Sequence, residues 1–231
     1  MPNWCYNRTY VYGPAEDRKR FHSAIETDKG FRIVNLLPMP ELLEGSTSTF
    51  SHTPEPPEQW KTLLASGDWT QEDYDTSVAR HVERYNEGQR LKEATGYTDW
   101  YNWANVWWGT KWGDCDTFVQ DQGEFLELSY NTAWGPFNEN IWLKACELFP
   151  TLGFITGARE ESNAFVLVVG FVNGDEVYYE EGELPYAEFE SIEDDEDRWE
   201  NMNDWEHEWL ERGTAKAIDA VLESLAETNR R

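Results

Sequence analysis

Hydrophobic and polar residues alternate along the first part of the chain in a way that predicts a strand, a helix and a second strand. Residues 3–13 carry aromatic side chains at even positions with β-branched residues between them, which is typical of a strand. Gly13-Pro14 ends this run, and a helix with acidic residues in its first turn follows. Residues 31–37 are apolar up to Pro38, so we expect a second strand there. The opening is therefore predicted as β-α-β.

The next part of the chain changes to helical spacing. Residues 38–57 are rich in Pro, Ser, Thr and Glu and are predicted as a surface loop. Thr70 to Asp73 resembles a capping signal, and apolar residues at helical spacing follow it as far as Gly96. The chain from about residue 38 to 113 is therefore predicted as a mostly helical insertion.

An unusually aromatic stretch, residues 97–113, ends this insertion. Trp100, Trp103 and Trp107 repeat at i, i+3 and i+7, which predicts a helix that is apolar over most of its circumference and ends at Gly109. Such a helix is normally buried. We therefore expect it to form the centre around which the remaining elements pack.

The second half of the chain reads mainly as strands. Two short apolar runs flank a turn at residues 121–123, and residues 134–136 lead into a helix with Phe137, Ile141, Ala145 and Leu148 on one face. Three further strands follow, the last two joined by Asn173-Gly174. This order predicts an α+β fold with a ferredoxin-like antiparallel sheet and helices on one face. We expect one domain over residues 1–180 and an acidic helical segment over 181–231, packed on that domain or appended to it.

Four short motifs occur in order over about the first 180 residues: Met1-Pro2-Asn3-Trp4-Cys5-Tyr6-Asn7, Pro38-Met39-Pro40-Glu41-Leu42, Trp107-Trp108-Gly109-Thr110-Lys111-Trp112 and Tyr130-Asn131-Thr132-Ala133-Trp134-Gly135-Pro136. Together they resemble the YubB-like family of phage and plasmid proteins. The resemblance implies a ferredoxin-like domain in a protein of a mobile genetic element. It implies no catalytic residues, because no activity is assigned to that family.

The composition restricts the classes of function. The chain of 231 residues has 45 acidic and 19 basic residues, a formal charge of −26. Such a surface repels nucleic acid and anionic membranes and attracts basic proteins. Three widely spaced cysteines and the lack of a leader or a long apolar run favour a reduced, cytoplasmic setting in the host cell.

Much of the negative charge lies in one segment. Residues 175–211 contain 17 acidic residues and one basic residue, Arg198. Within it, five apolar residues fall near one helical face: Ile192, Trp199, Met202, Trp205 and Trp209. A solvated or disordered tail would also explain the charge. If the segment is a docked helix, however, carboxylates from Glu193 to Glu211 would spread over about 27 Å, near the spacing of phosphates along a DNA strand.

The hypothesis that follows is a non-enzymatic accessory protein that binds a basic host protein and mimics DNA, possible partners being restriction or CRISPR-type defence nucleases. The residues expected to bind this partner are Glu193, Asp194, Asp195, Glu196, Asp197, Glu200, Asp204, Glu208 and Glu211. No cofactor is expected. No metal site is expected either, because the histidines and the Asp114-Cys115-Asp116 run lack suitably spaced partners.

Two alternatives stay open. Thr98, Asn102 and Asn105 form a polar stripe on the aromatic helix and, with Lys111, would either bond internally or line the pocket of a small-ligand-binding protein or enzyme. Internal bonding is favoured. The apolar stripe of residues 214–228 would pack on the core or form a dimer seam, so the oligomeric state is undecided.

Overall fold

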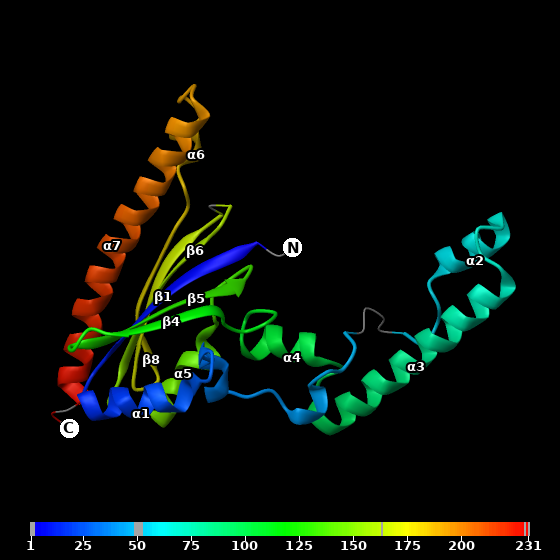
Figure 1. Cartoon of the computed structure of the whole chain (residues 1–231), viewed down its shortest axis with the longest axis horizontal. Helices are drawn as coiled ribbons and strands as arrows, with labels where there is room; N and C mark the ends of the chain where they lie inside the picture. The colour runs from blue at the N-terminus through cyan, green and yellow to red at the C-terminus, as the bar shows by residue number, and fades with distance from the viewer. Residues whose placement is uncertain (1–2, 49–52, 163, 229, 231) are drawn as a thin grey trace. The chain divides into compact units, whose positions relative to one another are not determined.

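The computed structural model describes residues 3–48, 53–162, 164–228 and 230. The chain divides into two compact units (Figure 1). The first unit consists of Met1–Pro38 and Trp107–Arg231, and the second of Met39–Val106. The second unit lies within the range predicted as a helical insertion.

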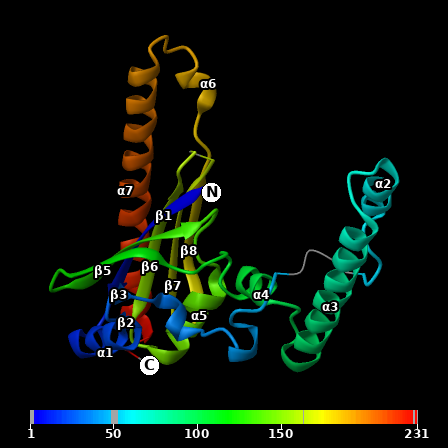
Figure 2. The ribbon, with the colours of Figure 1, turned by 45° about the vertical axis from the view of Figure 1, so that its right-hand side comes forward.

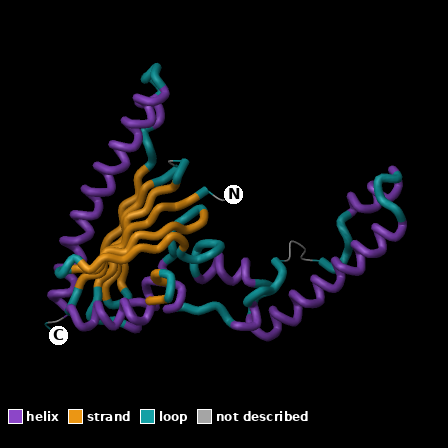
Figure 3. Tube along the Cα trace, viewed as in Figure 1, coloured by secondary structure: helices purple, strands orange, loops and turns teal. Residues whose placement is uncertain are grey.

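The first unit is built on one six-stranded sheet, in which every neighbouring pair of strands is antiparallel (Figure 3). The strand order is β4-β5-β1-β6-β7-β8. This confirms the predicted α+β class. The strands are β1 (Trp4–Tyr12), β4 (Cys115–Asp121), β5 (Phe125–Ala133), β6 (Gly153–Glu160), β7 (Val166–Val172) and β8 (Asp175–Gly182).

Helices lie on both faces of this sheet (Figure 2). On one face, α1 (Ala15–Ile25) and α5 (Glu139–Leu148) enclose an aromatic core. The Phe21 ring lies 5.3 Å from that of Phe154, and Trp142 lies 5.8 Å from Phe154 on the other side. The opposite face carries the long helix α7 (Asp195–Thr228), which follows the short α6 (Tyr186–Phe189). The C-terminal segment is thus packed on the sheet, on the face opposite α1 and α5.

The strand expected over residues 31–37 is absent from this sheet. Only β3 (Gly30–Phe31) is extended, paired with β2 (Glu26–Thr27), and a 3₁₀ helix, η1 (Ile33–Leu36), follows. The reason is tertiary: the buried carboxylate of Asp114 accepts a hydrogen bond from the Val34 N–H at 3.1 Å, which holds the chain in a turn. A short apolar run does not distinguish these two conformations.

The second unit is helical, as predicted. Its elements are η2 (Glu41–Leu43), α2 (Glu58–Ser66), α3 (Gln71–Thr95) and most of α4 (Trp100–Trp107). The capping signal before α3 is confirmed, since Thr70 and Asp73 bond reciprocally, and Gly96 ends the helix at a φ of 85°. Of the predicted surface loop, residues 49–52 lie outside the described part of the chain.

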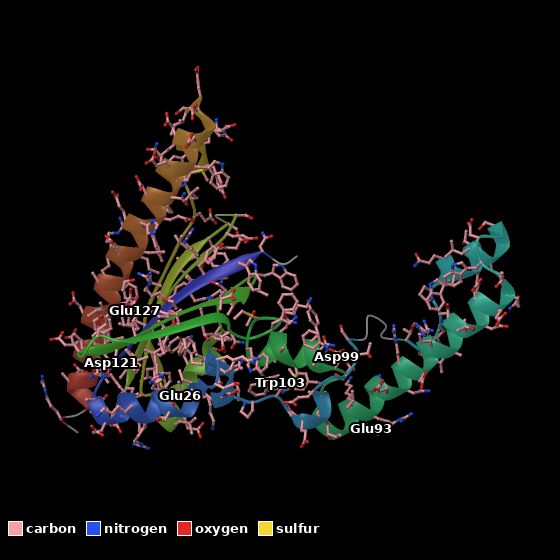
Figure 4. All side chains as sticks on the ribbon, in the orientation of Figure 1. Glu26, Glu93, Asp99, Trp103, Asp121 and Glu127 are labelled. Carbon is pink, nitrogen blue, oxygen red and sulfur yellow. The ribbon has the colours of Figure 1, made fainter. Side chains whose placement is uncertain are left out.

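The expectation that the aromatic stretch forms the centre of the fold is wrong. Helix α4 has only eight residues and ends at Trp107, and of these only Trp103, which is labelled in Figure 4, and Ala104 are buried. The main core lies instead between the sheet and α1/α5, where Trp142, Tyr130 and Phe21 are almost inaccessible. Aromatic content indicated burial but not which elements would share it.

The strand connections follow the predicted turn chemistry. Asn173 and Gly174 join β7 to β8 with φ values of 52° and 86°, as a type I′ hairpin turn requires. Between β4 and β5, Gly123 has a φ of 85° and donates its N–H to the Asp121 carboxylate at 2.8 Å. Both predicted hairpins are therefore confirmed.

Helix α7 approaches the sheet closely because glycines lie beneath it. Added Cβ atoms at Gly153 and Gly170 would lie 2.4 Å and 3.1 Å from the methyl groups of Val221. One at Gly182 would lie 2.7 Å from the Trp209 ring. Val221 and Trp209 are buried in one cluster with Val168 and Ile155 of the sheet. The apolar stripe at the end of the chain therefore packs mainly on the sheet, although Leu222 is exposed.

We predict that Gly153→Ala destabilises the protein by about 1–3 kcal/mol, because the new methyl group overlaps Val221, whose side chain has little rotameric freedom. Urea denaturation followed by tryptophan fluorescence measures the effect. Gly135→Ala is the matched control, since a Cβ there meets no atom within 4 Å. Equal unfolding midpoints for the two variants would show that α7 does not need this close approach.

Candidate functional site

The nine acidic residues predicted to bind a partner are all exposed, and we call them the acidic ridge: Glu193, Asp194, Asp195, Glu196, Asp197, Glu200, Asp204, Glu208 and Glu211. The first two precede α7, and the other seven lie on its first five turns. Asp194 accepts hydrogen bonds from the N–H groups of Glu196 and Asp197 at 2.9 and 3.1 Å. It therefore caps the helix, which fixes the start of the ridge.

The apolar residues of this segment dock the helix that carries the ridge. Met202 and Trp209 are buried, and Ile192 and Trp205 are half-buried, whereas Trp199 is 54% exposed. The Arg198 guanidinium donates to the Ile192 carbonyl at 2.6 Å, which connects the segment before α7 to the first turn of the helix. The predicted docked helix is confirmed, except that Trp199 is not one of its anchors.

One carboxylate in this stretch does not belong to the ridge. Glu206 is 1% exposed and accepts a hydrogen bond from Arg159 of β6 at 3.0 Å. Its second oxygen, Oε1, has no hydrogen-bond partner among the described residues. Burial raises the pKa of Glu206, and the positive charge of Arg159 opposes this shift. The pair joins α7 to the sheet at the cost of an incompletely bonded carboxylate.

The raised pKa of Glu206 predicts a pH-dependent effect of Glu206→Gln. A carboxyl group whose pKa is higher in the folded than in the unfolded state stabilises the fold when it is protonated. This contribution is lost as the pH rises above 4.5, the pKa in the unfolded state, and through the pKa in the folded state. The glutamine cannot ionise. We therefore expect the stability of the variant relative to the wild type to increase from pH 4.5 to pH 7, measured by urea denaturation. A difference independent of pH would contradict the raised pKa.

The polar stripe of α4 is bonded internally, as favoured from the sequence. The Asn102 amide donates to Thr98 Oγ1 and Asp99 Oδ2 at 2.9 and 2.8 Å, and Asn105 donates to the Tyr101 carbonyl at 2.7 Å. Asp99 is fully buried and also accepts the Asn102 N–H at 2.9 Å (Figure 4). These side chains complete the N-terminus of a short helix.

Lys111 lies in the first unit, in a small aromatic cluster. Its ammonium group is 4.4 Å from the centre of the Trp112 ring and 5.5 Å from that of Trp134. Both tryptophans are partly exposed, and Trp134 has a φ of 66°, which is unusual for a bulky residue. These contacts are cation–π interactions within the first unit.

A groove that the sequence did not indicate lies beside α7. It has a volume of about 590 Å³, within the range of small-molecule sites. Its floor is the α7-side face of β1 and β5, including Tyr6, Tyr10 and Phe125, and its wall is one flank of α7 from His207 to Ile218. The sequence indicates the aromatic residues of β1 only as strand formers, and the position of α7 places them in a groove.

The charged residues on the groove floor are mostly paired. Arg8 Nε lies 3.2 Å from the Glu127 carboxylate, whose position on the β4–β5 hairpin is shown in Figure 4. Arg159, bound to Glu206, lies 4.8 Å above the centre of the Tyr6 ring. Burial is the main cause that raises the pKa of Tyr10, with Glu127 and Glu211 adding to it and Arg8 opposing it. The floor is thus aromatic with internally neutralised arginines.

Within the described residues, no group of three or more His, Cys, Asp or Glu side chains is arranged to hold a metal ion. None of the helices there combines the length and apolar character needed to cross a membrane.

No family model matches the chain, and neither does any curated protein. Among solved structures, the protein api92 from Yersinia pseudotuberculosis, of the DUF1281 family, is similar over 79% of this chain and 98% of its own. The sequence identity is 12% and the TM-score 0.46, values that establish neither a shared fold nor a shared function.

Proposed function

We propose that the protein is a non-enzymatic accessory protein of a phage or plasmid, acting in the host cytoplasm, that binds a basic host protein through the acidic ridge. The partner in this proposal is a nucleic-acid-binding defence protein such as a restriction or CRISPR-type nuclease, whose DNA groove the ridge would occupy. The link to mobile elements rests on the resemblance of the four sequence motifs to the YubB-like family.

One observation carries the proposal: the ridge begins at the cap of a continuous helix, and this helix is docked on the sheet from Glu206 and Trp209 onward. Carboxylates on such a helix are preorganised, so binding a basic surface orders few additional groups. A disordered tail of the same composition would lose conformational entropy on binding. The docked helix therefore supports a specific binding surface over a purely solubilising one.

The spacing of the ridge is compatible with DNA mimicry. With a rise of about 1.5 Å per residue, the seven ridge carboxylates on α7, from Asp195 to Glu211, extend over roughly 24 Å, or about one charge every 3.4 Å. Phosphates follow one another at about 3.4 Å along a DNA strand. The ion pair of Asp195 with Arg198, at 3.0 Å, is solvated and leaves the Asp195 side chain 86% exposed.

We predict that neutralising Glu193, Asp194, Asp195, Glu196 and Asp197 to Gln or Asn weakens partner binding by about 100-fold or more, because several close charge pairs are lost together. The partner is first captured from host lysate at low salt, and its affinity for each variant is then measured by titration. Binding by the wild type should fall steeply with salt, which screens exposed charges beyond about 8 Å at physiological ionic strength. Duplex DNA should compete for the same partner.

The matched control removes five equally exposed carboxylates from α3, namely Glu72, Asp75, Glu83, Glu87 and Glu93. This variant has the same net charge but an intact ridge, so it should keep nearly full affinity. Circular dichroism must show that both variants are folded. If the ridge variant still binds the captured partner with undiminished affinity, the ridge is not the binding surface.

A further inference from the structure

Within the described residues of the first unit, half of one sheet face has no covering helix. Helix α7 packs against β6, β7 and β8, and the remaining strands on that face are β4, β5 and β1. We call the α7-side face of these three strands the open half-sheet. Its exposed or half-buried aromatic residues are Tyr6, Tyr10, Tyr12, Phe118 and Phe125.

The side chains of the open half-sheet are brought together by the strand register. Tyr6 is paired with Asn131, and Tyr12 with Phe125, so both strands direct these residues to the same face. The Phe125 ring lies 5.2 Å from that of Tyr12 and 5.6 Å from that of Tyr10. On the edge strand β4, Phe118 is paired with Ser129 of the groove floor and is 63% exposed.

The dimensions of this face match one helix. Strands are spaced at about 4.8 Å, so three of them present a strip roughly 10 Å wide, which is the diameter of an α-helix with its side chains. The groove follows α7 from His207 to Ile218, a length of about 16 Å or three helical turns. On the other half of the same face, three strands are covered by one helix, α7.

The charges around the open half-sheet select the kind of helix. Arg8 and Arg159 are neutralised by Glu127 and Glu206. Among the described residues, Asp116, Glu124 and Glu211 at the rim form no ion pair with Lys, Arg or His; Asp116 accepts only the Asn131 amide at 3.1 Å. The remaining local charge is therefore negative, and it adds to that of the adjacent ridge. A second copy of this chain, at −26, would be repelled.

We propose that the open half-sheet and the flank of α7 form a docking groove for an amphipathic basic helix of a partner protein. The apolar face of that helix covers the aromatic floor, and its lysines or arginines lie against Asp116, Glu124 and Glu211. The proposal rests on the proposed function only in that the partner is basic; the surface is a different one, and Glu211 alone belongs to both. Aromatic residues at its centre are the typical anchors of such interfaces.

Designed peptides test the groove without a natural partner. The probe is an 18-residue amphipathic helix with leucine on one face and lysine on the other, and its affinity is measured by calorimetry and amide chemical shifts. We expect it to bind with shift changes in β1 and β5 and to keep more affinity in 0.5 M salt than an oligolysine of equal charge, since salt screens charge but not apolar burial. The same helix with glutamate in place of lysine should not bind.

Two variants with matched controls locate the site. Phe118→Asp should weaken binding of the leucine–lysine peptide about 10-fold or more. Leu148→Asp, at an exposed apolar residue of α5 on the other face of the sheet, should not. Ala215→Arg places a bulky cation on the groove wall and should have a similar effect, whereas Ala226→Arg, further along the same helix, should not. If the leucine–lysine peptide binds both Phe118→Asp and Ala215→Arg with unchanged affinity, the proposal is overturned. It is also overturned if salt weakens the leucine–lysine peptide and the oligolysine equally.

The ridge variant separates this inference from the proposed function. Neutralising the five residues 193–197 leaves the groove intact, so the leucine–lysine peptide should bind it within about threefold of the wild type. Loss of the captured host partner with retention of the peptide supports both surfaces. Loss of the peptide in this variant would assign its binding to the ridge and overturn the groove.

Discussion

The packing of α7 against β6, β7 and β8 determines both candidate surfaces. Glycines at positions 153, 170 and 182 let Val221 and Trp209 approach the strands, and the buried Arg159–Glu206 pair adds a polar link. Because one face of the helix is fixed in this way, the residues of the acidic ridge on its other side point to solvent. Among the described residues of the first unit, the same packing leaves β4, β5 and β1 without a helix on that face. The ridge and the groove are thus two consequences of one helix position.

Charge is distributed unevenly over this architecture. Arg8 and Arg159, the two arginines of the groove floor, are each held by a carboxylate, so they do not offset the acidic residues around them. Residues 195–211 of α7 include no lysine and one arginine, Arg198. Its guanidinium donates a hydrogen bond to the Ile192 carbonyl, just before the helix. The resulting field favours basic partners on the α7 side of the sheet at any approach distance shorter than the screening length.

Local patterns in the sequence predicted most of the elements. The reciprocal cap at Thr70 and Asp73, the Asn173-Gly174 turn and the Asp121–Gly123 turn depend on interactions within a few residues, and all three are present. The docked acidic helix was also predicted, because Met202 and Trp209 recur at helical spacing. The predicted strand over residues 31–37 is wrong because its conformation depends on a contact distant in sequence. Asp114 accepts a hydrogen bond from Val34 and holds the chain there in a turn.

The sequence by itself determined the α+β class, the helical insertion and which residues form the acidic helix, since periodicity, caps and turns are local properties. Only the tertiary structure decided which aromatic residues became core. The tryptophans of residues 100–112 are in part exposed, and Tyr6 and Tyr10 of β1 face a groove, whereas Trp142 is buried. It also decided that Glu206, which lies in the same stretch as the ridge residues, is buried against Arg159. An amphipathic pattern specifies that a face is covered but not by which element, because that depends on contacts between residues far apart in the chain.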